Sequence, residues 1–242
     1  MNIYYKLIIF STILILCGTF LTFAIFKFNF SKIKEKELDK KILMWIPMAL
    51  IFILSLYLGK IFRIIIFSTI LLFCYLEFKK HYTKNKKVLL YFLMSIIGLS
   101  HLGLFNLVSD YKIILVYLII GTVVSDVFGF LLGNTIGVHK LPEYINNKKS
   151  WEGVIGQILG AIVGVILVHQ YLFSNNYIFL FLPIGLGCVI GDLGNSYTKR
   201  IIGVKNWSES IPGHGGFLDR FSSLSGSSFL TFYFLLIIYL IK

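Results

Sequence analysis

The stretch that decides the fold runs from Tyr177 to Arg200 and reads YIFLFLPIGLGCVIGDLGNSYTKR. It is apolar for most of its length, and two cations close it. An α-helix rises about 1.5 Å per residue, so roughly 20 such residues cross the hydrocarbon core of a bilayer. The stretch therefore predicts a transmembrane helix. Asp192 lies inside it, and an acid within a membrane span is costly enough to indicate a functional site.

The whole chain has the composition of a membrane protein. Of its 242 residues, 57% are hydrophobic and 14% are charged, and the mean hydropathy is +0.84. Soluble domains carry about 25% charged residues, which excludes an ordinary soluble globular protein. A net charge of +12 would favour nucleic acid as the partner of a soluble chain. In an apolar chain the same surplus indicates cations at a membrane surface, so we expect membrane lipids and no nucleic acid as partners.

Apolar segments of spanning length occur eight times and predict an all-α integral membrane protein. Their approximate bounds are 4–26, 42–59, 61–78, 88–108, 113–138, 152–173, 177–198 and 223–241. Only Lys60 separates the second segment from the third, which fits either a tight hairpin or one long bent helix. The first segment is expected to be a retained helix, because it is too long for the apolar region of a signal peptide and no small-residue cleavage motif ends it.

The basic residues predict how these helices are oriented. Of the 23 Lys and Arg residues, 18 lie in the loops that follow the first, third, fifth and seventh segments. Cytoplasmic loops are enriched in Lys and Arg, so we expect these loops in the cytoplasm and both termini outside. We divide the chain into N-terminal spans, 1–110, and a C-terminal membrane domain, 111–242, which carries the candidate site and the cytoplasmic loops 139–151 and 199–222.

The candidate site gathers at the cytoplasmic ends of the helices in the second part. Asp126 and Asp192 each lie in the cytoplasmic half of a predicted span, beside the two polar loops. Asp192 is followed at four, seven and eight residues, and therefore on the same helix face, by Ser196, Lys199 and Arg200. A non-functional explanation stays open, in which the cations extend to the membrane interface and the acid pairs with a neighbouring helix.

Both polar loops contain residues suited to an anion. The second loop ends in Pro212-Gly213-His214-Gly215-Gly216-Phe217-Leu218-Asp219-Arg220, and its glycines would let backbone N–H groups converge on a negative charge. The first loop ends in Lys148-Lys149-Ser150-Trp151-Glu152, which suits phosphate contacts, although a simple membrane anchor is also open. Separated carboxylates among cations are typical of a site for Mg²⁺ and a polyphosphate, because phosphate oxygens complete the shell of the ion.

These motifs resemble those of the phosphatidate cytidylyltransferases, also called CDP-diacylglycerol synthases. The resemblance rests on Ser196-Tyr197-Thr198-Lys199-Arg200, on Lys205 and on the segment from Pro212 to Arg220, with Asp192 upstream. Two further family blocks are similar to Asp126 with Gly133 and Gly137, and to Lys148-Lys149-Ser150-Trp151-Glu152-Gly153. The resemblance implies a membrane enzyme of phospholipid biosynthesis that transfers CMP from CTP to phosphatidic acid with Mg²⁺ and gives CDP-diacylglycerol and pyrophosphate.

The resemblance also implies roles for individual residues. Asp192 and Asp219 would hold Mg²⁺, and a second cation, monovalent or divalent, is left open. The implied catalytic residues are Asp192, Asp219, Lys199, Arg200 and His214. The implied substrate-binding residues are Ser196, Lys205, Gly215, Gly216, Arg220, Lys148, Lys149, Asp126 and Glu152. The protein would lie in a bacterial cytoplasmic (inner) membrane, and a homodimer is open.

Two positions depart from the pattern of that family. Asn206 and Ser222 stand where the family usually has Asp, which removes negative charges that could hold metal. Another lipid phosphate is therefore an alternative substrate. A related reaction is also open, either that of an isoprenoid-lipid cytidylyltransferase or that of a CTP-dependent lipid kinase. The non-enzymatic alternative is a transporter whose intramembrane acids carry ions.

Overall fold

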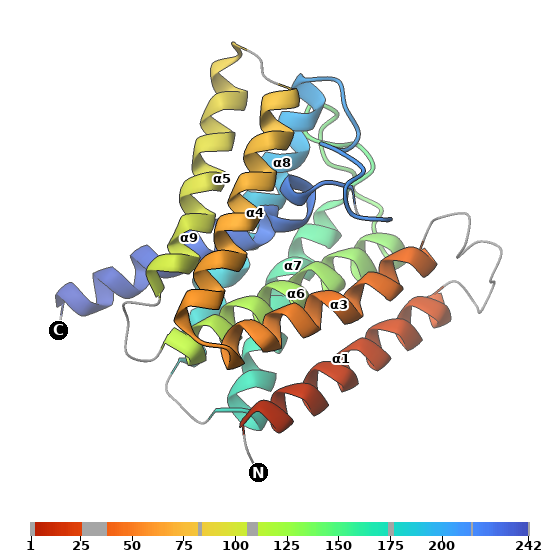
Figure 1. Ribbon diagram of the computed structural model, residues 1–242. Helices are drawn as coiled ribbons and strands as arrows, with labels where there is room; N and C mark the ends of the chain where they lie inside the picture. The colour runs from red at the N-terminus through yellow and green to blue at the C-terminus, as the bar shows by residue number, and fades with distance from the viewer. Residues whose placement is uncertain are drawn as a thin grey trace.

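The computed structural model is a bundle of long helices (Figure 1). It describes residues 3–25, 38–81, 84–105, 111–173, 177–213 and 215–241. The helices in these ranges are α1 (Ile3–Ile25), α3 (Leu38–Tyr57), α4 (Lys60–Lys80), α5 (Lys86–Leu104), α6 (Tyr111–Thr135), α7 (Trp151–Tyr171), the short 3-10 helix η2 (Ile178–Leu180), α8 (Phe181–Ile201) and α9 (Phe217–Ile241). The described ranges contain no strand, which confirms the all-α class.

Length and composition confirm the membrane assignment. In the part of the chain that the structure describes, seven helices are long and apolar enough to cross a bilayer. The remaining long helix is α3, whose apolar part, Leu43–Tyr57, is shorter than the roughly 20 residues that a span needs. The chain is therefore an all-α integral membrane protein, and each of the eight predicted segments corresponds to one of these helices.

A tight turn separates α3 from α4, which excludes one long bent helix. Gly59 adopts a φ of 96°, in the left-handed region that residues with a Cβ disfavour. Arg63 reaches back across the turn, and its Nη1 donates to the carbonyl oxygen of Ser55 at 3.1 Å. The Arg63 side chain is buried, so this hydrogen bond offsets part of the cost of taking a cation out of water.

Glycines let α6 and α7 pack with their backbones in close contact. In a membrane, helices associate through van der Waals packing and interhelical hydrogen bonds, so small residues favour close approach. A Cβ added at Gly156 or Gly160 of α7 would collide with the backbone of α6. At this short separation, Ser125 Oγ donates to the carbonyl oxygen of Gln157 at 2.7 Å. The packing therefore fixes Gln157 beside α6.

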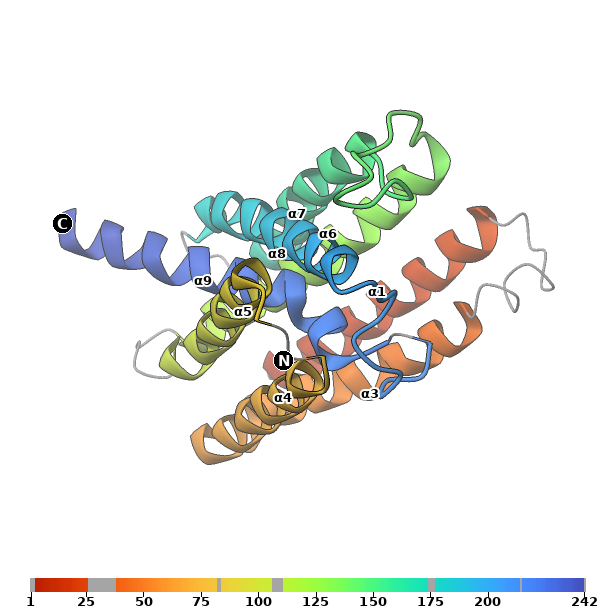
Figure 2. The same ribbon diagram turned by 90° about the horizontal axis from the view of Figure 1, so that it is seen from above.

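The same close packing holds α9 against α8 and α5 (Figure 2). A Cβ at Gly191 of α8 would collide with the backbone of Ser222, and one at Gly98 of α5 would collide with that of Ser225. The buried hydroxyl of Ser228 donates to the carbonyl oxygen of Gly98. Helices from both predicted parts of the chain thus surround α9, and the division at residue 110 stays a prediction.

The loops that flank the candidate site have different bounds from those predicted. Since α6 ends at Thr135 and α9 begins at Phe217, the loops are 136–150 and 202–216. Both emerge at the same end of the bundle (Figure 1). Asp219 therefore lies in the first turn of a helix, although the sequence predicted a loop there. The predicted apolar segment begins at residue 223, whereas α9 begins at Phe217. The charged residues in the first turn lower the local hydropathy, so hydropathy alone places the start too late.

Candidate active site

Two carboxylates within the membrane-spanning helices lie on either side of one glutamine. The Nε2 of Gln157 on α7 donates to Asp126 Oδ1 on α6 at 3.4 Å and to Asp192 Oδ2 on α8 at 3.0 Å. Ser223 on α9 donates its hydroxyl to Asp126 Oδ1 at 2.8 Å. Lys149 Nζ, from loop 136–150, forms an ion pair with Asp192 Oδ2 at 2.6 Å. Four helices and one loop therefore meet at these two acids.

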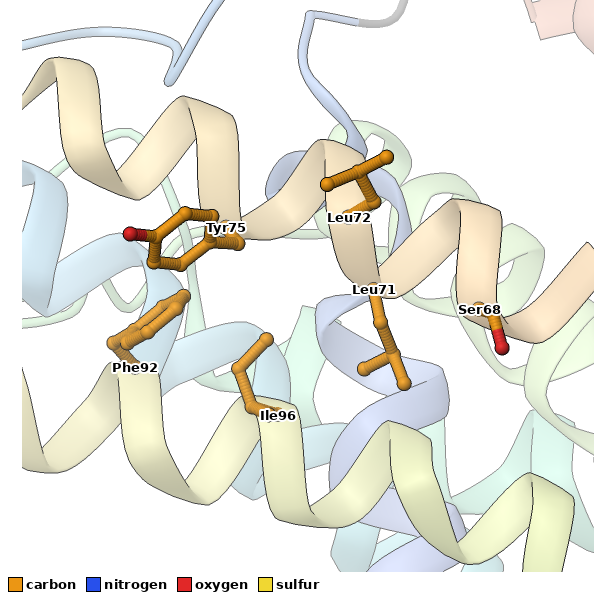
Figure 3. Close-up of a pocket in the computed structure, with 6 residues that line it drawn as sticks. All are labelled: Ser68, Leu71, Leu72, Tyr75, Phe92 and Ile96. Carbon is orange, nitrogen blue, oxygen red and sulfur yellow. The ribbon is translucent and has the colours of Figure 1, made fainter.

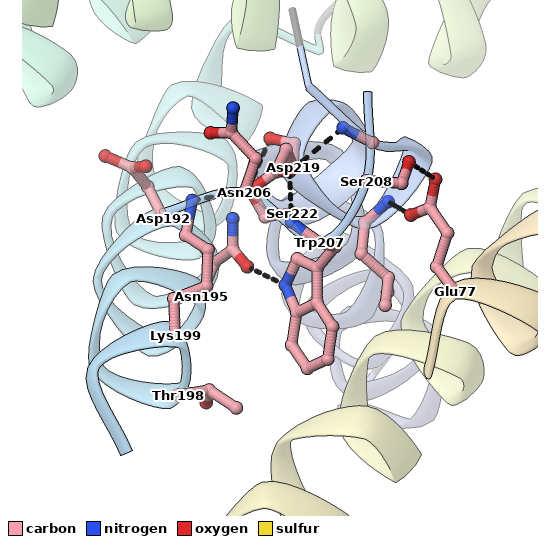
Figure 4. Close-up of polar contacts among 12 residues, drawn as sticks. Glu77, Asp192, Asn195, Thr198, Lys199, Asn206, Trp207, Ser208, Asp219 and Ser222 are labelled. Carbon is pink, nitrogen blue, oxygen red and sulfur yellow. Dashed lines mark hydrogen bonds and ion pairs between the residues drawn. The ribbon is translucent and has the colours of Figure 1, made fainter. Parts of the chain in front are cut away.

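A third carboxylate, that of Asp219, joins the end of α8 to the start of α9. Its Oδ1 accepts a hydrogen bond from Lys199 Nζ at 2.5 Å. Its Oδ2 accepts from the backbone N–H groups of Trp207 and Gly216, both at 2.9 Å. The Asp219 side chain is only 5% exposed, and these charge-assisted contacts compensate its burial. Figure 4 shows Asp219 between the lysine on α8 and the loop that carries Trp207.

Three cations balance the three acids. Lys149 pairs with Asp192, and Lys199 pairs with Asp219. Arg220, the neighbour of Asp219 on α9, interacts electrostatically with all three acids. The formal charges of these six side chains therefore balance. A polyphosphate could replace the acids as the partner of the cations, because it is negatively charged. A divalent metal bound with it could replace the cations as the partner of the acids.

The glycine-rich loop directs its N–H groups at carboxylates of the protein itself. Gly216 donates to Asp219, while the N–H groups of Phe217 and Leu218 donate to Glu77 on α4 at 2.8 and 2.9 Å. The N–H groups of Gly216, Phe217 and Leu218 therefore already have partners within the protein. The sequence predicted substrate phosphate at this position through Gly215 and Gly216. That role stays a prediction, and in this conformation both glycines shape the loop.

Several other predicted residues lie on the helix and loops that carry the cluster. Ser196 is buried on the face of α8 that Asp192 and Lys199 share. Lys148 and Lys205 are exposed in loops 136–150 and 202–216, and Arg200 is exposed in the last turn of α8. Exposed cations near a buried acid cluster attract anions from solution. Their predicted roles in phosphate binding are compatible with these positions.

Another predicted residue, Glu152, bonds to the loop that precedes its own helix. Glu152 Oε1 bonds His139 Nδ1 at 2.5 Å and accepts from the His139 backbone N–H at 3.1 Å, so it closes loop 136–150 onto the start of α7. Its predicted role in substrate binding has no support from these contacts. His214, predicted as catalytic, lies outside the described residues.

The positions that depart from the family pattern are bonded locally. Asn206 Nδ2 donates to Glu209 Oε1 at 2.7 Å within loop 202–216. Ser222 is buried against α8, and its hydroxyl donates to the carbonyl oxygen of Asp219 at 3.3 Å. Both side chains thus have hydrogen-bond partners within their own segments.

Four residues of the site were missed by sequence reasoning. Gln157 and Ser223 join the acids, Trp207 donates to Asp219, and Glu77 binds the start of α9. Gln157 had a usable signal, because a polar side chain in an apolar helix is costly unless it is bonded. Glu77 had none, since its partners lie far along the chain in the other half of the sequence.

The donor set fits a divalent metal that is bound together with substrate. Among the described residues, no group of three or more His, Cys, Asp or Glu side chains is close enough to hold an ion alone. Mg²⁺ commonly takes one or two carboxylates and completes its octahedral shell with phosphates and water. Asp192, whose side chain is 27% exposed and paired with a lysine, is suited to such a shared site.

A separate apolar groove lies between α4 and α5 (Figure 3). Its volume is about 460 Å³, and its lining consists of Ser68, Leu71, Leu72, Tyr75, Phe92 and Ile96. None of the three acids or their cation partners lines it. Apolar side chains of this kind are expected where a helix pair faces hydrocarbon. The groove adds no chemistry to the candidate site.

The described helices thus form a membrane domain with acids and cations gathered at one end. The family model that matches residues 1–238 is described as the cytidylyltransferase family. The chain therefore belongs to the cytidylyltransferase family, and the resemblance in the motifs is confirmed.

Individual relatives carry more specific names. The phosphatidate cytidylyltransferase of Haemophilus influenzae is 35% identical over 188 residues, 69% of this chain and 64% of that protein. The phosphatidate cytidylyltransferase of Rickettsia bellii is 37% identical over 130 residues, 49% of this chain and 55% of that protein. Phosphatidate cytidylyltransferase 4, chloroplastic, of Arabidopsis thaliana is 40% identical over 119 residues, 48% of this chain and 30% of that protein. The matches thus cover from 30% to 64% of the length of these relatives.

Proposed function

We propose that this protein transfers CMP from CTP to phosphatidic acid and releases pyrophosphate, which leaves CDP-diacylglycerol in the membrane. Membership of the cytidylyltransferase family and the names of its relatives support this reaction. The observation that carries the proposal is the convergence of three carboxylates and three cations at one end of a membrane bundle. Both substrates are phosphates, and one of them is confined to the membrane.

In the proposed reaction, an oxygen of the phosphatidate attacks the α-phosphorus of CTP. A new P–O bond forms there, the bond from the α-phosphorus to the bridging oxygen of the β-phosphate breaks, and pyrophosphate leaves with that electron pair. The attacking phosphate is already ionised, so no strong base is required. The protein must therefore hold two anions in line and neutralise their charge, which suits Lys149, Lys199 and Arg220.

The acids of the cluster are proposed to hold Mg²⁺. Bound Mg²⁺ supplies Lewis-acid stabilisation of negative charge on the phosphates. We propose Asp192 and Asp219 as its ligands, as predicted from the sequence, with Asp126 as the further carboxylate beside Asp192. Lys149 and Lys199, which pair with two of these acids in the ligand-free structure, would then bind phosphate oxygens. A second cation stays a prediction.

The loop end of the bundle is proposed to face the cytoplasm of a bacterial cell, in the inner membrane. The enrichment of Lys and Arg in the loops at this end supports that orientation. Two of the relatives are bacterial proteins, which supports the assignment to a bacterial membrane. Association as a homodimer also stays a prediction.

The proposal is tested with purified protein in lipid nanodiscs supplied with CTP, Mg²⁺ and phosphatidic acid. We expect equal amounts of pyrophosphate and CDP-diacylglycerol, measured by a coupled phosphate assay and by lipid mass spectrometry. Parallel reactions with an isoprenyl phosphate or an isoprenoid alcohol identify the alternatives, since a kinase would yield CDP and a phosphorylated lipid. The Asp192→Asn variant should be inactive, and the Glu143→Gln variant, altered at an exposed loop acid, should match the wild type. Failure to turn over CTP with any lipid would exclude the proposal.

A further inference from the structure

Glu77 connects the N-terminal helices to the candidate site. It lies on α4 and is 5% exposed. Its Oε1 accepts hydrogen bonds from Ser208 Oγ at 2.6 Å and from the Phe217 N–H at 2.8 Å, while its Oε2 accepts from the Leu218 N–H at 2.9 Å. Figure 4 shows the side chain reaching from α4 to the loop that precedes α9. One carboxylate therefore binds both the loop and the helix start.

These contacts match the electrostatics of a helix N-terminus. The first N–H groups of a helix have no partner within the helix, and the helix dipole favours a negative charge beside them. A buried carboxylate is costly without hydrogen bonds, and Glu77 has three. A Cβ at Gly216 would collide with the Glu77 carboxylate, so a larger residue at this position would have to displace that carboxylate from its hydrogen bonds.

The held segment is the one that carries two members of the acid and cation cluster. Phe217 and Leu218 directly precede Asp219 and Arg220 in the first turn of α9. A shift of that turn would move the Asp219 carboxylate away from Lys199 and from the Trp207 N–H. The orientation of both charged side chains therefore depends on where the first turn is held.

A second contact from the same helix end holds the loop itself. His81, just after α4, bonds the carbonyl oxygen of Trp207 through Nε2 at 2.7 Å. The Trp207 indole is buried and donates to Asn195 Oδ1 on α8 at 2.7 Å. The end of α4 thus holds loop 202–216 through two residues, His81 and Glu77. Glu77 also binds the first turn of α9.

We propose that Glu77 is a positioning residue that holds the first turn of α9 in the geometry required for CMP transfer. The inference rests on the proposed function, because it concerns the same site. Glu77 acts through Asp219 and Arg220 and does not itself meet the substrate. The opposite hypothesis is that Glu77 occupies a phosphate position and is displaced by CTP, and that hypothesis predicts the reverse effect of its removal.

Three variants separate these hypotheses. Glu77→Gln removes the charge and turns an amide N–H toward backbone donors, whereas Glu77→Asp keeps the charge on a shorter side chain. Ser208→Ala removes one donor and is a milder change in case Glu77→Gln does not fold. Glu143→Gln is the matched control, because Glu143 is an exposed acid of the other loop.

Hydrogen exchange of the segment 215–220 is measured first, on ligand-free protein in nanodiscs. Loss of a charge-assisted hydrogen bond should speed exchange of the Phe217 and Leu218 amides by about tenfold or more in Glu77→Gln. In the assay with CTP and phosphatidic acid, we expect kcat per folded protein to fall by about tenfold or more, with the KM for phosphatidic acid unchanged and partial recovery in Glu77→Asp. Ser208→Ala should show smaller changes in the same direction.

Each result decides the proposal. It is overturned if Glu77→Gln keeps wild-type exchange and kinetics, if its lost activity only follows the lost folded fraction, or if its KM for CTP falls. It is also overturned if Glu143→Gln loses as much activity as Glu77→Gln. If the wild type makes no CDP-lipid, the proposed function fails, and the exchange of the Phe217 and Leu218 amides still decides whether Glu77 holds the helix start.

Discussion

Replacing Asp219 by Asn measures how strongly the ion pair with Lys199 stabilises the join between α8 and α9. The paired atoms are 2.5 Å apart, and the Lys199 and Asp219 side chains are 15% and 5% exposed. Asn leaves the Lys199 ammonium in a largely dry site without its carboxylate, and breaking a buried pair costs about 3–5 kcal/mol. Lys199 can still extend its long side chain toward water, so we expect a loss near the lower limit, about 3 kcal/mol.

A double-mutant cycle with Lys199→Met isolates the pair. Lys199→Met leaves the Asp219 carboxylate with two backbone donors at 2.9 Å, so the expected loss is smaller, about 1–2 kcal/mol. The double variant removes both charges together. It should therefore be more stable than the sum of the single losses predicts, with a coupling energy of about 1–3 kcal/mol.

The assay is reversible unfolding in mixed micelles, with the fraction of SDS as the denaturing variable. The free energy of unfolding is followed by tryptophan fluorescence, because Trp207 is buried and bonded directly to Asp219. Additive losses in the double variant, or single losses below about 0.5 kcal/mol, would mean that the pair behaves like an exposed surface pair. Either result would refute the reasoning.

Three further predictions concern the other acids, the packing of α7 on α6, and Ser222. Asp192→Asn should abolish turnover, whereas Asp126→Asn should raise the Mg²⁺ concentration for half-maximal turnover about tenfold or more, as shown by metal titration after EDTA treatment. Gly160→Val should lower the free energy of unfolding by about 1–3 kcal/mol, because a Cβ at position 160 collides with the backbone of α6. Gly103→Ala is the control and should not lower the free energy of unfolding, because a Cβ at position 103 has no neighbour within 4 Å. Ser222→Asp should lower the melting temperature in EDTA, since it buries a carboxylate beside acids that are already balanced, and Mg²⁺ should restore it.

The helices could be predicted from the sequence because each depends mainly on local hydropathy. The segment 177–198, for example, corresponds to η2 and α8, and Lys60 with Gly59 marks a real turn between α3 and α4. The start of α9 could not be predicted in this way. Its first turn is stabilised by the carboxylates of Glu77 and Asp219, and Glu77 comes from a distant helix.

The site could be predicted only in part, for a related reason. Hydropathy and charge place Asp126 and Asp192 at one end of the bundle, because each is an acid inside an apolar segment. The partner that joins them, Gln157, depends on how closely α7 packs on α6, and that distance is set by Gly156 and Gly160. Packing of this kind is a tertiary property that one-dimensional patterns do not contain.

The course of α7 bears on the alternative of an ion transporter. Gln157 contacts the acids at one end, and His169 bonds the Tyr117 hydroxyl at 3.3 Å near the other end. Between them, the buried positions Ala161, Val165 and Val168 are apolar and fully enclosed. An ion moving along α7 would meet no polar side chain of that helix between Gln157 and His169, and leaving water over such a stretch is costly in a low dielectric. The acids thus lie toward the end of α7 that adjoins loop 136–150, as expected for phosphate chemistry on a lipid whose headgroup lies at that surface.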